Sequence, residues 1–187
     1  MILDIKIEFS LPEILENLSN DALQEQINER KVNIKKAYWD EINIDDKVEM
    51  KVQMTRKLVS IFAMISADYN PLHVDEEYGK NLKIFGNNNI AHGYFLQSFF
   101  SGLGGTYLLG EGAALHEKLP SKFLRYVAVN DEILVQKIVV DKFEKVVKGK
   151  TRYYVETKEV IKVKRDDKFI VAVESGTIST IFKKSRE

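Results

Sequence analysis

The segment that determines the fold of this chain is Ala91 to Gly110, with the sequence AHGYFLQSFFSGLGGTYLLG. Apolar side chains occur all round a helical wheel in this segment, and such a pattern predicts a helix that is buried on every side. Gly102, Gly104 and Gly105 interrupt the pattern, although each glycine costs a helix about 1 kcal/mol relative to alanine. We therefore expect these glycines to let a sheet or a ligand approach the helix closely.

Strand-like sequence lies on both sides of this segment. Before it, residues 48–54 (VEMKVQM) alternate apolar and polar side chains, as a half-buried strand does. After Gly112 come further strand-like runs, with turn residues at Asn130-Asp131, Lys148-Gly149 and Asp166-Asp167 between them. The runs are SKFLRYVAV, DEILVQKIVVDKF, TRYYVETKEVIKVKR and KFIVAVESGTISTIF. One strand, a buried helix and a meander of long strands predict an α+β domain in which an antiparallel sheet wraps around a central buried helix, the hot-dog arrangement.

The N-terminal residues have a different, helical character. Ser10-Leu-Pro-Glu13 has the spacing of a capping box with proline in the first turn, and residues 19–31 (SNDALQEQINERK) restart or extend that helix. We therefore predict a helical extension at residues 1–37 and a hot-dog domain at residues 38–187.

Composition excludes several classes of function. Among the 187 residues, 28 Lys and Arg balance 28 Asp and Glu, so no overall field attracts nucleic acid or an anionic membrane surface. The chain has no cysteine, which rules out disulfides, a thiolate nucleophile and a Cys-ligated zinc site. No run approaches the roughly 18 apolar residues of a membrane span, and the first residues do not resemble a signal or transit peptide. We expect a cytoplasmic protein with no nucleic-acid partner and no membrane span.

The first chemical feature is Asp68-Tyr-Asn-Pro-Leu-His73. Thr55 can cap a helix that ends near Ala67, so Asp68 follows directly on its last turn. Pro71 fixes its own φ and biases the preceding residue toward extended geometry, which makes the connector between the two side chains stiff. The carboxylate and the imidazole can then converge on one water as a general acid and base. The residues from Asp68 to Ile90 are predicted as a long ordered loop, and such loops are usually functional.

The second feature is His92-Gly93, where the buried helix begins. Glycine there leaves its N–H open at the positive end of the helix dipole, which suits a developing oxyanion. An acid, a base and such a donor together suit the addition or removal of water next to a thioester carbonyl. Neither His92 nor His116 has zinc or iron spacing with the first feature, and the chain lacks a Gly-rich dinucleotide fingerprint. We therefore predict no metal, nicotinamide or flavin.

These residues resemble those of the MaoC-like (R)-specific enoyl-CoA hydratases of the hot-dog fold, and the resemblance runs from about Tyr38 to Phe182. The matching motifs are Asp68-Tyr-Asn-Pro-Leu-His73, Phe85-Gly86, Ile90-Ala-His-Gly93, Ser101-Gly102 and Gly110-Glu-Gly112. The resemblance implies that Asp68 and His73 hold the water that adds across the double bond, and that the amide of Gly93 binds the thioester oxygen. It also implies a serine on the central helix that orients the site, here Ser101. The thioester would be that of coenzyme A or an acyl carrier protein, with no other cofactor.

Two more residues join the candidate site. We assign Asn70 and His92, with Ser101, to substrate binding; for His92 the alternative is a structural ring that holds the loop. The chain departs from the family at Tyr126-Val127, at Asn130-Asp131 and at residues 87–89, where three asparagines replace the more usual basic and proline-containing approach to the helix. None of these departures removes an acid or base group of the candidate site, so they concern substrate rather than reaction.

The sequence thus predicts (R)-specific hydration of trans-2-enoyl thioesters to 3-hydroxyacyl thioesters, or the reverse dehydration, in fatty-acid or related acyl metabolism. Two alternatives stay open, a hot-dog acyl-CoA thioesterase and a non-catalytic acyl-thioester binding module. The family resemblance implies a homodimer, and a single curled sheet has an open edge that a second copy can cover.

Overall fold

The computed structural model describes residues 19–31 and 37–183. Its centre is a six-stranded sheet with the strand order β1-β4-β5-β6-β2, and the short strand β3 also pairs with β6. Every pairing is antiparallel. The strands are β1 (Lys47–Gln53), β2 (Ala113–Lys118), β3 (Ser121–Phe123), β4 (Glu132–Val147), β5 (Lys150–Arg165) and β6 (Lys168–Ile181).

Tight turns join the three long strands at the predicted places. Lys148 and Gly149 connect β4 to β5 with φ values of 51° and 72°, and Asp166 and Asp167 connect β5 to β6 with φ values of 46° and 62°. Positive φ at both central residues matches the twist of the flanking strands, which explains the choice of glycine and aspartate. Asn130, before β4, also has a positive φ of 73°.

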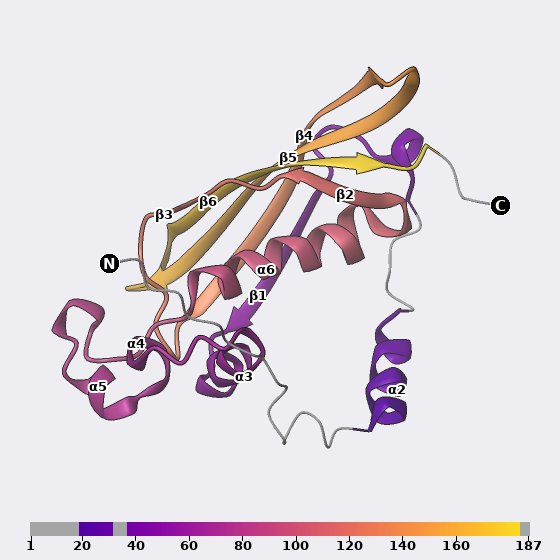
Figure 1. Cartoon of the computed structure of the whole chain (residues 1–187). Helices are drawn as coiled ribbons and strands as arrows, with labels where there is room; N and C mark the ends of the chain where they lie inside the picture. The colour runs from indigo at the N-terminus through magenta and orange to yellow at the C-terminus, as the bar shows by residue number, and fades with distance from the viewer. Residues whose placement is uncertain (1–18, 32–36, 184–187) are drawn as a thin grey trace, which may run out of the picture.

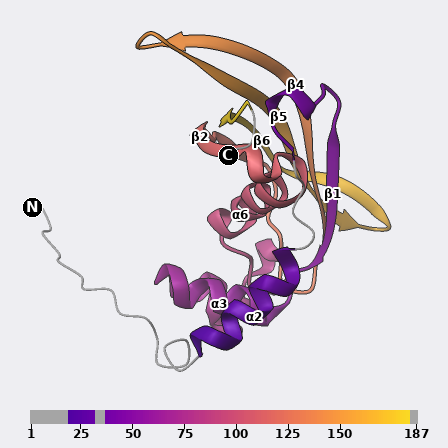
Figure 2. The same ribbon diagram turned by 90° about the vertical axis from the view of Figure 1, so that its right-hand side faces the viewer.

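The helix α6 (Gly93–Leu103) lies along the concave face of the sheet (Figures 1 and 2) and continues as a short π-helical segment, η3 (Gly104–Leu108). Phe95, Leu96, Phe100 and Leu103 are buried and form the main core with apolar side chains of the sheet. This arrangement confirms the predicted α+β hot-dog class.

The other side of α6 is open, so the expectation of burial on every side is wrong for the single chain. Tyr94 is 78% exposed, and Ser101 and Gly102 are also exposed. The sheet covers only one side of the helix, so the distribution of apolar residues around the helix predicted more burial than the single chain has.

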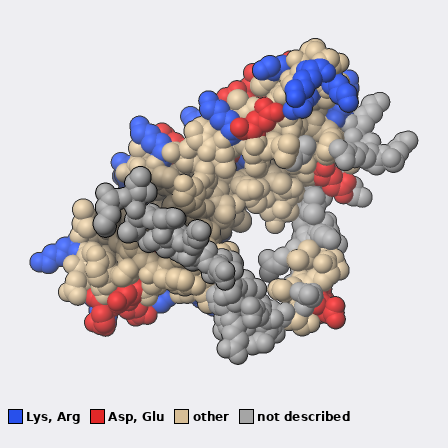
Figure 3. Space-filling model, in the orientation of Figure 1, with Lys and Arg blue, Asp and Glu red and all other residues tan. Residues whose placement is uncertain are grey.

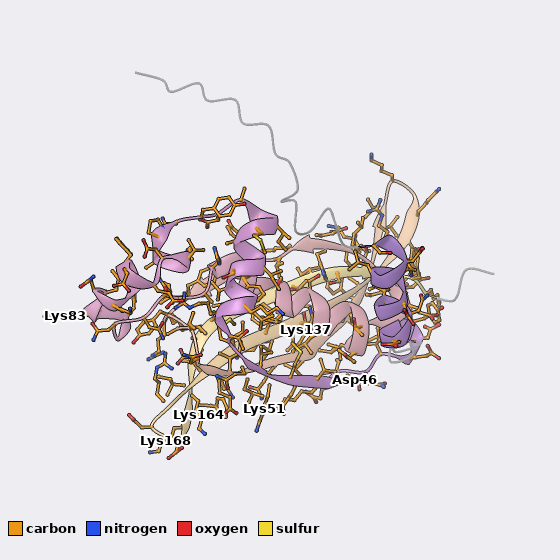
Figure 4. All side chains as sticks on the ribbon, turned by 90° about the horizontal axis from the view of Figure 1, so that it is seen from below. Asp46, Lys51, Lys83, Lys137, Lys164 and Lys168 are labelled. Atoms are coloured by element: carbon orange, nitrogen blue, oxygen red, sulfur yellow. The ribbon has the colours of Figure 1, made fainter. Side chains whose placement is uncertain are left out.

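The helix glycines differ from one another in their surroundings. A Cβ added at Gly102 or Gly105 would meet no atom within 4 Å, so the expected close approach is absent at these two positions. At Gly104 the expectation is confirmed, because a Cβ would lie 2.9 Å from Nζ of Lys137. Lys137 on β4, labelled in Figure 4, is 1% exposed. It pairs with the fully buried Glu159 on β5 at 2.6 Å.

The segment from Asp68 to Ile90 is ordered as predicted, but it is not a plain loop. It contains α4 (Pro71–Val74), α5 (Glu76–Lys80) and the 3-10 turn η2 (Lys83–Phe85), and it packs against α3 (Arg56–Ser66) at one end of the sheet (Figure 1). A second difference concerns SKFLRYVAV, which is a strand only at β3 and forms one isolated bridge, from Ala128 to Ile90.

The N-terminal region agrees with prediction where it is described. Residues Asn20–Lys31 form helix α2, whose described side chains are exposed, whereas the predicted start at Ser10 lies outside the described residues. The chain joins the sheet from Ala37 onward, because Gly112 N donates to Ala37 O at 2.9 Å and Trp39 N, in the 3-10 turn η1 (Trp39–Glu41), donates to Phe182 O at 3.0 Å.

Residues other than Lys, Arg, Asp and Glu make up most of the face shown in Figure 3, while Lys and Arg side chains gather at the tip of the β4–β5 hairpin. Neither described part of the chain, residues 19–31 or 37–183, contains a helix with the length and hydropathy of a membrane span.

Candidate active site

Helix α3 places Asp68 at the edge of the site. Thr55 Oγ1 accepts a hydrogen bond from Leu58 N at 3.3 Å and so caps the start of α3, as predicted. The helix ends at Ala67, whose φ of 58° is left-handed and turns the chain sharply. Asp68 follows this turn and is exposed.

Asn70 and Pro71 build the short helix α4 that carries His73. Asn70 Oδ1 accepts from Leu72 N at 3.0 Å, and Pro71 occupies the first turn, where its missing N–H costs nothing. Asn70 N also approaches Asp68 Oδ1 at 3.3 Å. The connector is therefore stiff, as predicted. The side chain of Asn70 is used as a helix cap, which leaves its predicted contact with substrate without support in the geometry.

The ring of His73 has a defined protonation pattern. Its Nδ1 lies 2.8 Å from Ile90 O. A carbonyl oxygen only accepts hydrogen bonds, so Nδ1 carries a proton, and in the neutral ring Nε2 keeps a free lone pair. His73 is thus held in the tautomer that a general base needs.

His92 lies directly behind this ring. Its side chain is 2% exposed, and its Nε2–H donates to the backbone oxygen of Asp68 at 3.0 Å. Burial lowers the pKa of His92, the hydrogen bond to Asp68 opposes this shift, and the neighbouring His73 lowers the pKa further. Nδ1 of His92 is buried and has no hydrogen-bond partner within the described chain. His92 therefore braces the loop, in line with the structural alternative.

Asp68, His73 and His92 each bring one side-chain donor atom to within 4.8 Å of the others. Two hydrogen bonds of about 2.8 Å each can span this separation, so one water can contact both Asp68 and His73. The rings of His73 and His92 stack at 3.8 Å with an interplanar angle of 27°. Nitrogen lone pairs lie in the ring plane, so two nearly parallel rings cannot both aim at one metal ion. The cluster suits a shared water better than a metal.

Gly93 supplies a free donor beside this cluster. It is the first residue of α6, and its N–H has no hydrogen-bond partner among the described residues. The same end of the helix carries the positive end of its dipole. A Cβ at this position would lie 3.1 Å from the ring of Phe123, so glycine lets this ring pack closely against the start of the helix.

A pocket of about 320 Å³ joins His73 and Gly93. The rest of its lining is mostly apolar and comes from Ile90, Ala91, Leu96, Phe123, Leu124, Arg125 and Tyr126. Asp68 borders His73 but does not line this pocket. Phe123 is half exposed at 50%, and its ring covers part of the pocket.

Ser101 is not brought to this pocket. It lies on the exposed side of α6, eight residues after Gly93, which is about 12 Å along the helix axis. Tyr126 and Phe123, in contrast, line the pocket although sequence reasoning assigned neither to the site. The one available signal was the departure from the family at Tyr126.

A larger groove of about 750 Å³ lies at the other end of the sheet, between β2, the β4–β5 hairpin and the end of β6. Tyr153 and Phe182 contribute to its lining, and Lys150, Arg152 and Lys183 are its basic residues. It contains none of the candidate acid or base groups.

Curated proteins similar to this chain share a single description. An (R)-specific enoyl-CoA hydratase of Aeromonas caviae is 32% identical over 100 residues, which cover 51% of this chain and 69% of that protein. The enzyme of the same name from Rhodospirillum rubrum is 30% identical over 96 residues, which cover 51% of this chain and 65% of that protein.

Solved structures give the same fold. The (R)-hydratase of A. caviae involved in PHA biosynthesis has a TM-score of 0.64 and 25% identity, over 74% of this chain and 96% of that chain. The R-hydratase PhaJ1 from Pseudomonas aeruginosa, in the unliganded form, has a TM-score of 0.67 and 22% identity, over 79% and 86% of the two chains. The model of the MaoC like domain family matches residues 41–164, which include the whole candidate site. The chain therefore belongs to the MaoC-like domain family.

Proposed function

We propose that this protein hydrates trans-2-enoyl thioesters to (R)-3-hydroxyacyl thioesters, or catalyses the reverse dehydration. The observation that carries the proposal is the hydrogen bond between His73 Nδ1 and Ile90 O, which leaves Nε2 as the free nitrogen of an imidazole that lies near Asp68 and lines the same pocket as Gly93. The family's hydratases support the choice of thioester substrate.

In this mechanism His73 Nε2 takes a proton from the water held with Asp68, and the oxygen of that water adds to C3 of the enoyl group. The electron pair of the double bond moves toward the thioester carbonyl. The proton gained by His73 then passes through the carboxylate of Asp68 to C2. One water has been added and both side chains are restored.

Gly93 stabilises the enolate-like oxygen that forms in between. A backbone N–H aimed at such an oxygen lowers the barrier by about 3 kcal/mol. The apolar pocket around Leu96 and Phe123 receives the acyl group. No metal, nicotinamide or flavin takes part, because hydration moves no electrons between substrate and cofactor. Coenzyme A or an acyl carrier protein carries the acyl group.

A homodimer is part of this proposal. Strands β1 and β2 form the two edges of the sheet, and an open edge invites pairing with another strand. Leu115 on β2 is 68% exposed, which gives this edge an apolar side chain for a second copy to cover. Sedimentation equilibrium at micromolar concentration should give twice the chain mass of 21.5 kDa.

The test of the function is the loss of enoyl-thioester absorbance with crotonyl-CoA and longer enoyl-CoA substrates, followed by chiral analysis of the product. We expect an (R)-3-hydroxyacyl thioester with the thioester intact. Release of free thiol from saturated acyl-CoA would instead identify a thioesterase, and ligand binding without turnover would identify a binding module.

A further inference from the structure

Asn89 is a fully buried polar residue next to the segment that carries His73. Its Nδ2 lies within hydrogen-bond distance of three carbonyl oxygens, Pro71 O at 3.1 Å, Leu72 O at 3.1 Å and Asp75 O at 2.8 Å. Its Oδ1 accepts from Arg56 Nη1 of helix α3 at 3.0 Å. One side chain therefore connects α3 to both ends of α4.

Helix α4 needs such a partner. It has four residues, and two backbone bonds close its turns, His73 N to Asn70 O at 2.9 Å and Asp75 N to Pro71 O at 3.1 Å. A helix this short is unstable alone, and its carbonyl oxygens depend on donors from outside the helix. The amide of Asn89 adds such a donor to Pro71 O, Leu72 O and Asp75 O.

The backbone beside Asn89 leads directly to the proposed base. Ile90 N donates to Leu72 O at 3.3 Å, and Ile90 O accepts from Nδ1 of His73 at 2.8 Å. On its other side, the carbonyl of Asn89 accepts from Val129 N at 2.9 Å. Asn89 thus fixes both α4, which carries the imidazole, and the neighbouring carbonyl that sets the tautomer of the imidazole.

The groups around residue 89 require a side chain that both donates and accepts hydrogen bonds, as an amide does. Arg56 can only donate and the three carbonyls can only accept, so the oxygen of Asn89 must face Arg56 and its nitrogen must face α4. Gly79 packs against the amide, and a Cβ at Gly79 would lie 2.8 Å from it. Arg56 is held in turn by Glu76, with Nε 3.0 Å from Oε1. A carboxylate would fit the same space but would face three carbonyl oxygens without a proton to donate.

We infer that Asn89 is a positioning residue for the proposed hydratase reaction, and this inference rests on the proposed function. Asn89 acts through His73: it holds α4 and Ile90 so that Nε2 of His73 faces the water with its lone pair free. Residues 87–89 are among the places where this chain departs from the family pattern.

The test is Asn89→Asp, which removes the donor and keeps the shape. We expect kcat to fall by about 10-fold to 100-fold while KM changes by less than about 3-fold, because a base displaced by a fraction of an ångström to an ångström loses rate rather than substrate affinity. The matched control is Asn87→Asp, two residues away at an exposed position with a φ of 58°, and it should keep the kcat of the natural chain.

A second readout does not depend on activity. The ring ¹⁵N chemical shifts of His73 should report a protonated Nδ1 and an unprotonated Nε2 in the natural chain and in Asn87→Asp, and a mixture of tautomers in Asn89→Asp. If Asn89→Asp does not fold, Arg56→Gln, which removes the guanidinium that orients the amide, should show the same changes at smaller amplitude.

The outcomes separate this inference from the proposed function. Unchanged kcat and an unchanged His73 spectrum in folded Asn89→Asp or Arg56→Gln would overturn the positioning role. A changed His73 tautomer in Asn89→Asp, together with a natural chain that hydrates no enoyl thioester, would support the positioning of His73 and refute the proposed reaction.

Discussion

The imidazole rings of His73 and His92 are stacked, with centroids 3.8 Å apart and an interplanar angle of 27°. Only one of the two rings can hold a positive charge comfortably at this distance, because two imidazolium ions in contact repel. Burial lowers the pKa of His92, which favours its neutral form, and His73 is the ring that lines the pocket. In the proposed mechanism His73 exchanges the proton and His92 packs behind it.

The depressed pKa of His92 predicts a pH-dependent stability. Burial holds the folded-state pKa below the ordinary value of 6.5, so around and below pH 6.5 the unfolded chain binds a proton that the folded chain does not. The contribution of His92 to the free energy of unfolding should be complete above pH 6.5. As the pH drops below 6.5, the free energy of unfolding should fall by at most about 1.4 kcal/mol per pH unit for one histidine. Urea unfolding between pH 5 and 8 measures this slope.

His92→Gln should reduce the slope, since glutamine can keep a donor near Asp68 O without titrating. Some slope should remain, because burial also lowers the pKa of His116, the positive charge of Lys137 adds to that shift, and Glu159 opposes it. A slope as steep in His92→Gln as in the natural chain would show that His92 is not the group responsible.

The buried ion pair of Lys137 and Glu159 predicts a large effect of single substitutions. Nζ of Lys137 lies 2.6 Å from Oε1 of Glu159, with the two side chains 1% and 0% exposed. Glu159→Gln leaves a buried ammonium without its counter-charge and should lower the free energy of unfolding by about 3–5 kcal/mol. The double variant Lys137→Met, Glu159→Gln should lose less than the sum of the two single changes, as a double-mutant cycle will show.

The matched control is the exposed pair of Lys80 and Glu77, where Glu77→Gln should leave stability unchanged within error. Equal effects of Glu159→Gln and Glu77→Gln would contradict the burial of the central pair.

Two glycines of the central helix should respond in opposite ways to alanine. A Cβ at Gly104 would meet Nζ of Lys137 at 2.9 Å, and this ammonium cannot move away without leaving Glu159. Gly104→Ala should therefore destabilise the fold by about 1–3 kcal/mol. Gly102→Ala adds a methyl group in open space inside α6 and should stabilise the fold by about 0.4–1 kcal/mol. Thermal unfolding of both variants measures the difference, and a stabilising Gly104→Ala would refute the contact.

The main elements of the fold were predictable from local chemistry. Thr55 is a helix cap, Lys148-Gly149 and Asp166-Asp167 are two-residue turns, and the alternation at residues 48–54 is a strand, each as the sequence indicates. The open side of α6 was not predictable, because an apolar wheel does not tell which of its sides a sheet will cover. Lys137 and Glu159 were also missed, since each looks like a solvent-facing charge within its own strand.

The candidate site was predictable where its residues are close together along the chain. Asp68 and His73 meet because Pro71 stiffens a short connector, and Gly93 joins them at the start of α6. Phe123 and Tyr126 line the pocket although they are distant from Asp68, His73 and Gly93 along the chain. The side chain of Asn89 holds α4 by hydrogen bonds to residues earlier in the same loop. Such contacts depend on how the chain closes on itself, which no local pattern encodes.

The most direct test of the central claim is the initial rate of crotonyl-CoA hydration by Asp68→Asn and His73→Ala, compared with Asp167→Asn and His116→Ala as controls away from the site. We expect both site variants to lose nearly all activity while remaining folded, and both controls to stay close to the natural chain. A rate within a few-fold of the natural chain in either folded site variant would contradict the shared-water mechanism.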